Sequence, residues 1–332
     1  MKNKYIFFRT DRIGDFLLSS ILIKSIKRSD KNSFIIVVAS QKNYFYINRC
    51  NFIDEVILFP NSYLLKFIFY LRFFFKRFYL IAVLDGKKRS LYFSLITRSK
   101  FKFFFTYKKF YKIFFKNFFT HIFYDHDFKN KISEIKVLLN FLSFDLCEDD
   151  FNTIDKSLVA SRDFKIPIFH NFTLLHLDEK WIFEDYIKKY KSIEPLSEKI
   201  LLNFIEKLIL KTNNDVFIST GSVPNKFTKF FKLNFTMVEK DIFELKILKN
   251  RVIFFDNMNF LQLEKLILSA NLLISCHGAP THVAAAFGIK IIDIIDNSEK
   301  VFFDKWTSHF NNYTCLERNS FEHLANKIIL NS

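Results

Sequence analysis

The feature that most constrains the fold is a repeated alternation of short apolar runs with longer amphipathic stretches. In the first half of the chain, strand-like runs lie at 5–8, 34–39, 55–59, 80–84 and 101–105. Helical patterns follow them at 15–28, 62–78 and 131–144. A chain that alternates strand and helix in this way forms a parallel sheet with helices on both faces. We therefore predict an α/β fold.

The same alternation resumes in the second half. Strand-like runs lie at 172–176, 215–219, 251–255, 272–275 and 290–295, and helical patterns at 181–189, 196–211, 260–270, 280–287 and 321–330. Between the halves, residues 145–170 break the rhythm with a cluster of acidic residues and Pro167. A length of 332 residues also suits two domains. We predict two Rossmann-like domains, 1–155 and 156–332, with the ligand site in the cleft between them.

Only five glycines occur in this Phe- and Lys-rich chain, at positions 14, 86, 221, 278 and 288. Each follows a strand-like run or lies at the edge of a helical pattern. In such a composition we expect glycine where φ must be positive or where another group comes close to the backbone. The positions suit loops at the carboxyl ends of strands, where open α/β sheets bind ligands.

The stretch Arg9–Asp15, RTDRIGD, joins the first strand to the first helical pattern. We expect Gly14 to permit a tight turn and Asp15 to begin the helix. Aspartate is favoured at a helix start because it accepts hydrogen bonds from free backbone N–H groups, which would be a purely structural role. A carboxylate at this place can also act as a general base. Asp11 and Arg12 would then fix the loop or contact a substrate.

A second strand-to-helix turn lies at Ser275–His282, SCHGAPTH. We expect Gly278 to make the turn and Pro280 to be the first helical residue, where its missing N–H costs nothing. The free N–H groups of such a helix start favour an anion. His277 and His282 lie five residues apart, but no third ligand is evident, which argues against zinc. A structural role inside the turn is the alternative for His282.

These motifs resemble, in the same order, those of glycosyltransferase family 9, the ADP-heptose:lipopolysaccharide heptosyltransferases. Residues 9–20, R-x-D-R-I-G-D-x-L-L-S-S, are similar to the family's N-terminal signature, and Cys276–Gly288 is similar to its second signature. His176–Trp181 resembles the middle motif, in which a Lys-Trp pair opens the C-terminal lobe. The stretches Asn51–Val56 and Leu84–Gly86 also fit.

The resemblance implies a GT-B fold, which is two Rossmann-like domains facing each other across a cleft, and an inverting mechanism with no metal or other cofactor. Asp15 would deprotonate the acceptor hydroxyl, with Asp11, Arg12 and Gly14 on the acceptor side. A nucleotide-diphospho-sugar, suspected to be ADP-heptose, would bind mainly to the C-terminal lobe. The residues expected to hold it are Lys180, Thr220, Gly221, His277, Gly278, Ala279, Pro280, Thr281 and His282. The family usually has Asp at the position of His277.

Three other interpretations remain open. Asp125-His126-Asp127 has the D-x-D form that metal-dependent glycosyltransferases of the other main fold use, although its Lys-rich surroundings indicate a solvated turn. A GT-B-fold epimerase or hydrolase would act on a nucleotide-sugar without an acceptor. A non-catalytic module would bind a nucleotide-sugar without turnover.

The formal net charge of +16 is concentrated in one segment. Residues 61–120 hold 14 Lys and Arg against a single acid, Asp85, together with 22 Phe and Tyr. A biased composition alone would produce this, but basic and aromatic side chains together also favour an anionic lipid surface. We therefore expect contact with a membrane surface through 61–120, and the family resemblance implies an anionic glycolipid as the acceptor. No nucleic-acid-binding motif accompanies the charge, so we expect no nucleic-acid partner.

We expect no targeting or membrane-spanning segment. The N-terminus is a short strand-like run followed by charges, unlike a signal peptide. Residues 61–80 contain four basic residues and residues 266–289 contain a glycine and a proline near their middle, which argues against a span in either. The four cysteines are widely spaced without a C-x-x-C pair, which favours a reducing compartment. The predicted location is cytoplasmic, peripheral on the inner face of the inner membrane.

Overall fold

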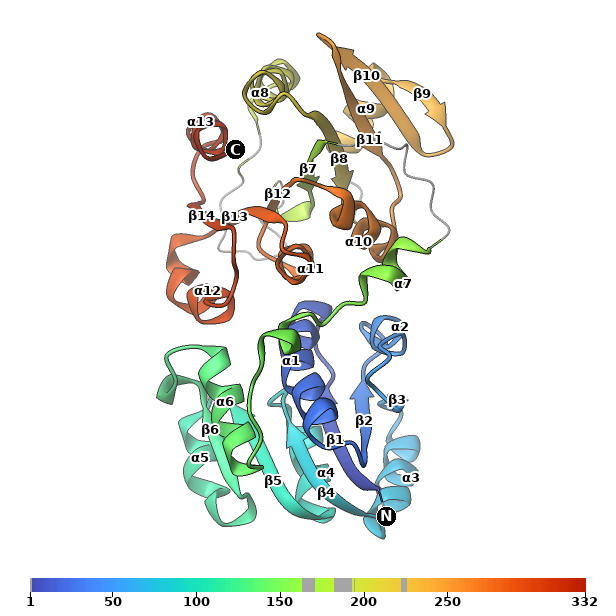
Figure 1. The fold of residues 1–332 in the computed structure, drawn as a ribbon, viewed down its shortest axis with the longest axis vertical. Helices are drawn as coiled ribbons and strands as arrows, with labels where there is room; N and C mark the ends of the chain where they lie inside the picture. Colours follow the sequence, from blue (N-terminus) through green and yellow to red (C-terminus); the bar gives the residue numbers. More distant parts are fainter. Residues whose placement is uncertain (1, 163–170, 182–192, 194, 222–225) are drawn as a thin grey trace. The chain divides into compact units, whose positions relative to one another are not determined.

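The computed structural model describes residues 2–162, 171–181, 193, 195–221 and 226–332. Its contacts divide the chain into two compact units, Met1–Thr153 and Ile154–Ser332. Each unit is an α/β domain built on its own sheet (Figure 1). The predicted alternation of strands and helices is confirmed in both units.

The N-terminal unit contains a six-stranded parallel sheet in the order β3-β2-β1-β4-β5-β6. Its strands are β1 (Asn3–Arg9), β2 (Ser33–Ala39), β3 (Glu55–Leu58), β4 (Arg77–Val83), β5 (Arg98–Thr106) and β6 (His121–Tyr124). Its helices are α1 (Ile13–Ser29), α2 (Tyr44–Ile47), α3 (Tyr63–Phe74), α4 (Lys88–Ile96), α5 (Lys109–Phe114) and α6 (Lys131–Phe141). Crossovers between parallel strands are right-handed, and α1 advances along the sheet in the direction opposite to α3, α4 and α5. These three helices therefore lie on the face opposite α1.

The face beneath α3, α4 and α5 is packed with aromatic rings. Phe69 and Phe73 of α3 contact Phe93 of α4 with ring centroids 5.4 and 5.6 Å apart. All three belong to one buried cluster with Ile6 and Phe8 of β1. Because burial of such a side chain stabilises the fold by roughly 1.5–3 kcal/mol, this cluster holds the helical layer on the sheet.

The C-terminal unit contains an eight-stranded sheet in the order β14-β13-β12-β7-β8-β11-β10-β9. Its strands are β7 (Phe172–Leu177), β8 (Asp215–Thr220), β9 (Thr236–Glu239), β10 (Ile242–Ile247), β11 (Asn250–Phe255), β12 (Leu272–Cys276), β13 (Lys290–Ile295) and β14 (Tyr313–Glu317). Its helices are α7 (Lys156–Ala160), α8 (Glu198–Thr212), α9 (Lys226–Asn234), α10 (Phe260–Ser269), α11 (Ala279–Phe287), α12 (Lys300–Thr307) and α13 (Phe321–Asn331). Among the described strands of this sheet, β10 runs antiparallel to both of its neighbours, β9 and β11, and the other pairs are parallel.

The two sheets repeat one strand order. Without the β9–β10 hairpin, the C-terminal order β11-β8-β7-β12-β13-β14 corresponds strand by strand to β3-β2-β1-β4-β5-β6. In each unit the direction of winding reverses between the first and fourth strands of the series, which are β1 and β4, or β7 and β12. Ligands of such sheets bind at the carboxyl ends of the strands beside this reversal.

Residues 62–78 form a helix and the start of a strand, where a single helix was expected. The helix α3 ends at Phe74 and β4 begins at Arg77. This part of the sequence is so rich in Phe and Leu that its hydrophobic pattern does not mark the boundary, and the aromatic residues of 77–83 suit a strand. Within the described ranges, no helix is both long and apolar enough to cross a membrane.

Several elements were absent from the sequence prediction: α2, α4, α5, β6, α9, β9, β10, α12 and β14. Residues 182–189, most of an expected helix, lie outside the described residues, and Glu179–Trp181 form a 3-10 turn. In the predicted linker, Glu148–Phe151 and α7 are short helices, and residues 163–170 also lie outside the described residues.

The two acids of the D-x-D stretch are both paired with lysines. Asp125 lies 2.5 Å from the ammonium of Lys131, which also contacts Glu134 at 2.8 Å, and all three side chains are almost completely buried. Asp127 lies 2.5 Å from Lys112, in a pair that is about half exposed. These pairs indicate a structural role for Asp125 and a solvated turn at Asp127.

These two pairs predict a contrast in stability. Lys131→Met removes the cation that two buried carboxylates share, so we expect the free energy of unfolding to fall by roughly 3–5 kcal/mol. Lys112→Met breaks an exposed pair and should cost about 0–1 kcal/mol. Urea denaturation of both variants measures the difference. Equal losses would show that the Lys131 cluster does not stabilise the unit.

Candidate functional site

Four of the five motifs recognised in the sequence lie at the two reversals of winding, and the fifth, Asn51–Val56, leads into the edge strand β3. Arg9–Asp15 follows β1 and Leu84–Gly86 follows β4 in the N-terminal unit. In the C-terminal unit, Asp178–Trp181 follows β7 and His277–His282 follows β12. Four stretches that are far apart in the sequence therefore form two clusters, one at the carboxyl edge of each sheet.

Arg9 ties together the first of these clusters. Its guanidinium, almost completely buried at the end of β1, donates from Nη1 to the carbonyl of Leu84 at 2.6 Å and to Asp11 Oδ2 at 2.9 Å. Its Nε donates to the carbonyl of Asp15 at 2.9 Å. One side chain thus fixes the loop after β1, the loop after β4 and the first turn of α1.

Asp15 lies in the first turn of α1, which begins two residues earlier than expected, at Ile13. Its carboxylate is half-buried, and Oδ2 accepts a hydrogen bond from the backbone N–H of Arg12 at 3.2 Å. Asp15 therefore has the structural role expected at a helix start, and this role uses one of its two carboxylate oxygens. The tight turn expected at Gly14 is wrong, because Gly14 is the second residue of the helix and does not have a positive φ.

Asp11 carries the most perturbed carboxyl of this unit. Burial raises its pKa to about 7, the carboxylates of Asp15 and Asp85 add to the rise, and Arg9 opposes it. Its Oδ1 is buried and accepts no hydrogen bond in the described part of the chain. Asp11 thus places a second carboxyl with base-like properties two residues from the helix that carries Asp15.

Thr10 connects Asp11's loop to residues that the sequence prediction missed. Its hydroxyl donates to Asp85 Oδ2 at 2.5 Å and accepts from Arg89 Nη2 at 2.8 Å. Lys87 donates from Nζ to the Thr10 carbonyl at 2.6 Å. Both cations follow the Leu84–Gly86 motif directly, so their position after a glycine loop was the available signal. The cluster therefore holds three carboxyls, Asp11, Asp15 and Asp85, and four cations, Arg9, Arg12, Lys87 and Arg89.

In the C-terminal unit, Trp181 anchors the loop after β7. Its fully buried indole N–H donates to the carbonyl of His176 at 2.9 Å. The ring of His176 is hydrogen-bonded through Nδ1 to Ser219 Oγ at 2.9 Å, and burial lowers the pKa of His176 to about 4, so it is neutral. Trp181 of the Lys-Trp pair is a core residue that sets the position of Lys180.

The ammonium of Lys180 lies between the loop after β7 and the loop after β12. Nζ lies 2.8 Å from Asp178 Oδ2 and donates to the carbonyl of His277 at 2.8 Å. Burial favours the neutral amine, but the carboxylate of Asp178 more than offsets this, and the pKa of Lys180 is raised. The side chain keeps 15% of its surface exposed, and its contact with the His277 carbonyl places the charged ammonium beside the turn after β12.

Two glycines bring the neighbouring loops into contact. A Cβ at position 278 would lie 2.7 Å from Lys180 Nζ, and one at position 221 would lie 2.6 Å from Glu179 Oε2. Thr220 pairs with Leu177 across β8 and β7, which places Gly221 beside the loop that holds Lys180. The expected close approach at Gly221 and Gly278 is confirmed, and the loops after β12, β7 and β8 form one surface.

The helix α11 begins one residue earlier than expected, and hydrogen bonds within its first turn use the Gly278 N–H. Its first residue is Ala279, so Pro280 is second and not first. The N–H of Gly278 donates to the hydroxyl of Thr281 at 2.8 Å, and that hydroxyl donates back to the Gly278 carbonyl at 2.7 Å. The Gly278 N–H is thus used inside the turn. That N–H is therefore not available to the anion that the sequence led us to expect here.

His282 fits the structural alternative. It is buried on α11, and its ring contacts Phe310 with centroids 5.2 Å apart and His277 with centroids 5.5 Å apart. Burial, with the neighbouring His277 and His309, lowers the pKa of His282 well below its ordinary value, so the ring is neutral.

His277 recruits a carboxylate from the next strand. Its Nδ1 lies 2.6 Å from Oδ2 of Asp293 on β13, and Tyr313 donates its hydroxyl to the same oxygen at 2.9 Å. The ring of His277 also packs on Phe303, with centroids 4.1 Å apart. The position where the family usually has Asp thus holds a histidine whose ring is fixed by an acid from β13.

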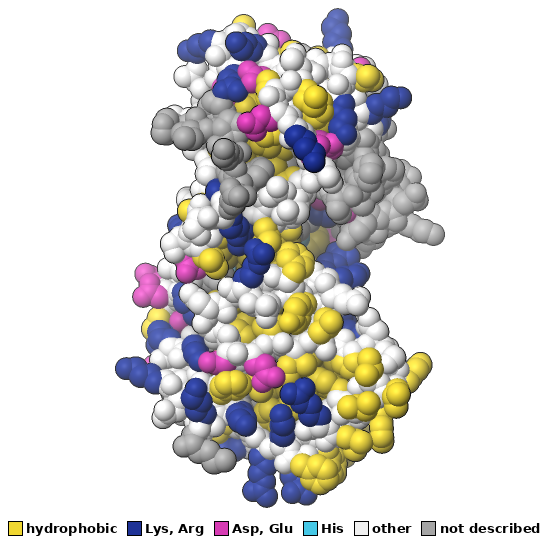
Figure 2. Space-filling view, turned by 90° about the vertical axis from the view of Figure 1, so that its right-hand side faces the viewer, with side chains coloured by type: hydrophobic (Ala, Val, Ile, Leu, Met, Phe, Trp, Pro, Cys, Tyr) yellow, Lys and Arg dark blue, Asp and Glu magenta, His cyan; other side chains and the backbone are white. Residues whose placement is uncertain are grey.

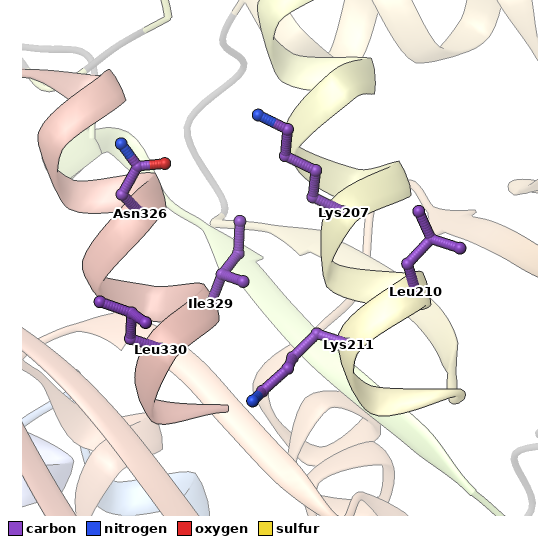
Figure 3. Close-up of a pocket in the computed structure, with 6 residues that line it drawn as sticks. All are labelled: Lys207, Leu210, Lys211, Asn326, Ile329 and Leu330. Atoms are coloured by element: carbon purple, nitrogen blue, oxygen red, sulfur yellow. The ribbon is translucent and has the colours of Figure 1, made fainter.

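A groove lies away from these loops. Figure 3 shows a groove of about 590 Å³ between α8 and α13, lined by Lys207, Leu210, Lys211, Asn326, Ile329 and Leu330. Because α8 ends where β8 begins, and α13 runs back from the end of β14, the groove lies at the amino edge of the sheet.

Among the described residues, no group of three or more His, Cys, Asp or Glu side chains is placed to hold a metal ion.

Solved structures share this fold along its whole length. The chain is 10% identical to E. coli heptosyltransferase WaaC with ADP, over 99% of this chain and 100% of that chain, with a TM-score of 0.65. It is 11% identical to E. coli ADP-heptose lps heptosyltransferase II, over 100% and 97%, with a TM-score of 0.66. It is also 11% identical to a glycosyl transferase family 9 structure from Veillonella parvula, over 99% of this chain and 98% of that chain, with a TM-score of 0.62. No family model matches the sequence, and neither does any curated protein.

At this level of identity the similarity establishes the fold. The predicted GT-B class, with two Rossmann-like units, is confirmed, and so is the resemblance to glycosyltransferase family 9 at the level of structure. A putative UDP-N-acetylglucosamine 2-epimerase from Listeria monocytogenes, 11% identical over 100% of this chain and 89% of that chain, is less similar, with a TM-score of 0.51.

The raised pKa of Asp11 predicts a pH dependence of stability. Between the ordinary Asp value of 3.8 and about 7, the unfolded chain ionises Asp11 while the folded chain keeps it protonated. The free energy of unfolding should therefore fall with rising pH by at most roughly 1.4 kcal/mol per unit, and level off above that range. Asp11→Asn should lack this slope in urea denaturation across the range.

Asp155→Asn is the matched control. Hydrogen bonds from Ser157 and from backbone N–H groups lower the pKa of the exposed Asp155, so its contribution changes only below the tested range. Wild-type and Asp11→Asn curves that stay parallel from acid to neutral pH would show that Asp11 is ionised throughout.

Proposed function

We propose that this protein is an inverting, metal-independent glycosyltransferase. It transfers a sugar, heptose or a related one, from a nucleotide-diphospho-sugar to a lipopolysaccharide-core or other glycolipid acceptor. The observation that carries the proposal is that four of the family 9 motifs, Arg9–Asp15, Leu84–Gly86, His176–Trp181 and Cys276–Gly288, fall at the two reversals of winding in a chain with the heptosyltransferase fold. Those are the places where sheets of this kind bind ligands.

The N-terminal unit supplies the acceptor side of the proposed reaction. Asp15 removes the proton of the acceptor hydroxyl. One oxygen of its half-buried carboxylate accepts a hydrogen bond from the Arg12 N–H, and the other oxygen faces the substrate. The oxygen that loses this proton then attacks the anomeric carbon of the donor sugar. Asp11 and Arg12 hold the loop around the acceptor.

The C-terminal unit supplies the leaving-group side. When the bond between the sugar and the diphosphate breaks, negative charge grows on the diphosphate. Lys180, held by Asp178 and by the carbonyl of His277, presents an ammonium there without needing to reorganise. The turn from Gly278 to His282 completes the donor site, together with Thr220 and Gly221. A fixed cation thus takes the part that a metal ion plays in D-x-D enzymes.

ADP-heptose is the donor that we propose first. Among the similar structures, one is a heptosyltransferase with ADP and another, 9% identical over 99% of this chain and 100% of that chain, is the same enzyme with ADP-2-deoxy-2-fluoro heptose, at a TM-score of 0.66. The replacement of the family's Asp by His277 changes the charge at this site. A related sugar or nucleotide is therefore tested alongside.

The acceptor that we propose is an anionic glycolipid, and the enzyme acts from the cytoplasmic face of the inner membrane. Residues 61–120 hold 14 basic residues and one acid, and this positive charge supports contact with such a surface.

A thermal-shift screen across nucleotide-sugars, followed by a transfer assay with and without EDTA, tests the proposal. We expect one donor to raise the melting temperature, and transfer to a glycolipid to survive EDTA. Release of free sugar or of an isomer without acceptor would favour the epimerase or hydrolase alternative. Donor binding with no turnover, unaffected by loss of Asp15, would favour a non-catalytic module.

The base assignment predicts the effect of Asp15→Asn. The amide keeps the size and the hydrogen bond at the helix start but is a poor proton acceptor, so kcat should fall about 10² to 10⁴-fold. Donor affinity, measured by calorimetry, should be nearly unchanged. Asp155→Asn makes the same change at the start of α7 and should leave kcat intact. Full transfer activity in Asp15→Asn would exclude it as the base.

The donor assignment predicts the effect of Lys180→Ala. Loss of a hydrogen bond to a charged group should weaken nucleoside-diphosphate binding by about 1.5–3 kcal/mol. Lys156→Ala, which removes a cation bonded to the carbonyl of Phe287 in the same unit, is the control. A thermal melt of each variant checks folding, because Asp178 loses its partner in Lys180→Ala. Equal affinities in folded wild type and Lys180→Ala would place the phosphate site elsewhere.

A further inference from the structure

The helix α3 has an outward face that is apolar along its whole length. Its exposed apolar side chains are Tyr63, Leu64, Leu65, Phe67, Ile68, Leu71 and Phe74, with Phe75 directly after the helix. All but Leu65 fall at positions i, i+1, i+4, i+5, i+8, i+11 and i+12, which is one side of an α-helix. Tyr63 and Phe75, at the two ends of this stripe, are 90% and 84% exposed.

The opposite side of α3 is apolar as well, but it is fully used by the fold. Phe69 and Phe73 point into the aromatic cluster over the sheet. A helix that serves only to cover a sheet needs one apolar face, with polar residues on the other. The outward stripe of α3 is therefore additional to what the N-terminal unit needs to fold.

Basic residues border the outward stripe. Lys66 and Arg72 lie on either side of it along the helix, and Lys66 Nζ lies 4.9 Å from the ring centroid of Tyr63. Lys and Arg at the edge of an apolar face can extend their charged ends toward a polar surface while their stems cover apolar atoms. This arrangement is typical of helices that lie in the plane of a membrane interface.

The helix α5, in the same layer beyond α4, repeats the combination. Phe110, Ile113 and Phe114 are exposed on α5, between Lys108, Lys109, Lys112 and Lys116. Tyr111 and Phe115 pack against the same aromatic cluster as Phe69, so α3 and α5 belong to one helical layer. Figure 2 shows hydrophobic side chains gathered on the N-terminal unit, in the lower part of the view, with Lys and Arg beside them.

We propose that the outward face of α3 inserts into the interface of an anionic lipid bilayer, and that α5, in the same helical layer, faces the same surface. The charge of the segment decides the occupant, because 14 basic residues against one acid complement anionic headgroups. A second copy of this chain would bring the same positive charge and be repelled. The proposal deepens the membrane contact suggested above: it adds burial of apolar side chains to electrostatic attraction.

Vesicle flotation with a triple variant tests the insertion. Leu64→Ser, Phe67→Ser and Leu71→Ser together should lower partitioning into vesicles of phosphatidylcholine with phosphatidylglycerol, on the order of tenfold per side chain. Leu210→Ser with Leu330→Ser is the control, since these residues are as exposed as Leu64, at 65% and 78% against 69%, but lie in the other unit. Circular dichroism confirms that each variant is folded.

Two further measurements separate insertion from attraction alone. Lys108, Lys109, Lys112 and Lys116 changed to Gln should lower binding on the order of fivefold per lysine, and less at high salt. Amides of α3 in the unmodified protein should exchange hydrogen more slowly when vesicles are present.

Unchanged partitioning of the triple variant, or equal binding to vesicles without phosphatidylglycerol, would overturn the proposal. A dimer that the triple variant converts to monomer, with no effect on vesicle binding, would assign the face to a second copy instead. All these readouts are binding rather than sugar transfer. Their failure therefore leaves the glycosyltransferase proposal standing, and failure of that proposal leaves the insertion standing.

Discussion

The reversal of winding within each sheet determines where the chemistry of this protein can be placed. Connections leave β1 and β4 toward opposite sides of the N-terminal sheet, and those from β7 and β12 diverge in the same way. The carboxyl ends of each pair are adjacent, so the loops that follow them meet although some 70 to 100 residues separate them. Motifs that are short and scattered in the sequence thereby become two compact clusters of charged side chains.

Each unit ties its two loops together with the same device. Arg9, at the end of β1, donates to the carbonyl of Leu84 beyond β4, and Lys180, after β7, donates to the carbonyl of His277 beyond β12. Each cation also pairs with a carboxylate two residues away in the sequence, Asp11 or Asp178. A buried cation that satisfies a carbonyl of another loop works as a non-covalent crosslink, because breaking it leaves polar groups unpaired. The two side chains differ in exposure, at 7% for Arg9 and 15% for Lys180.

The sequence was sufficient for the fold class and for the strand ends that carry the motifs, because hydrophobic alternation and glycine placement are local signals. It was insufficient where Phe-rich runs conceal a boundary, as between α3 and β4, and where strands are short or exposed, as in β9. The partner of His277 could not be predicted either. Asp293 reaches it only because β12 and β13 pair in a register that sets Ser275 opposite Asp293. Such contacts depend on the pairing of strands, which no local pattern encodes.

The placement of tryptophan gives the two units different optical signatures. The chain has two tryptophans, and both Trp181 and Trp306 belong to the C-terminal unit, whereas the N-terminal unit contains Phe and Tyr. Selectively excited indole emission therefore reports on one unit alone, while circular dichroism reports on both. Trp181 lies next to Lys180, and its indole is hydrogen-bonded within the core. The combined emission of Trp181 and Trp306 thus separates the melting of the C-terminal unit from the melting of its neighbour.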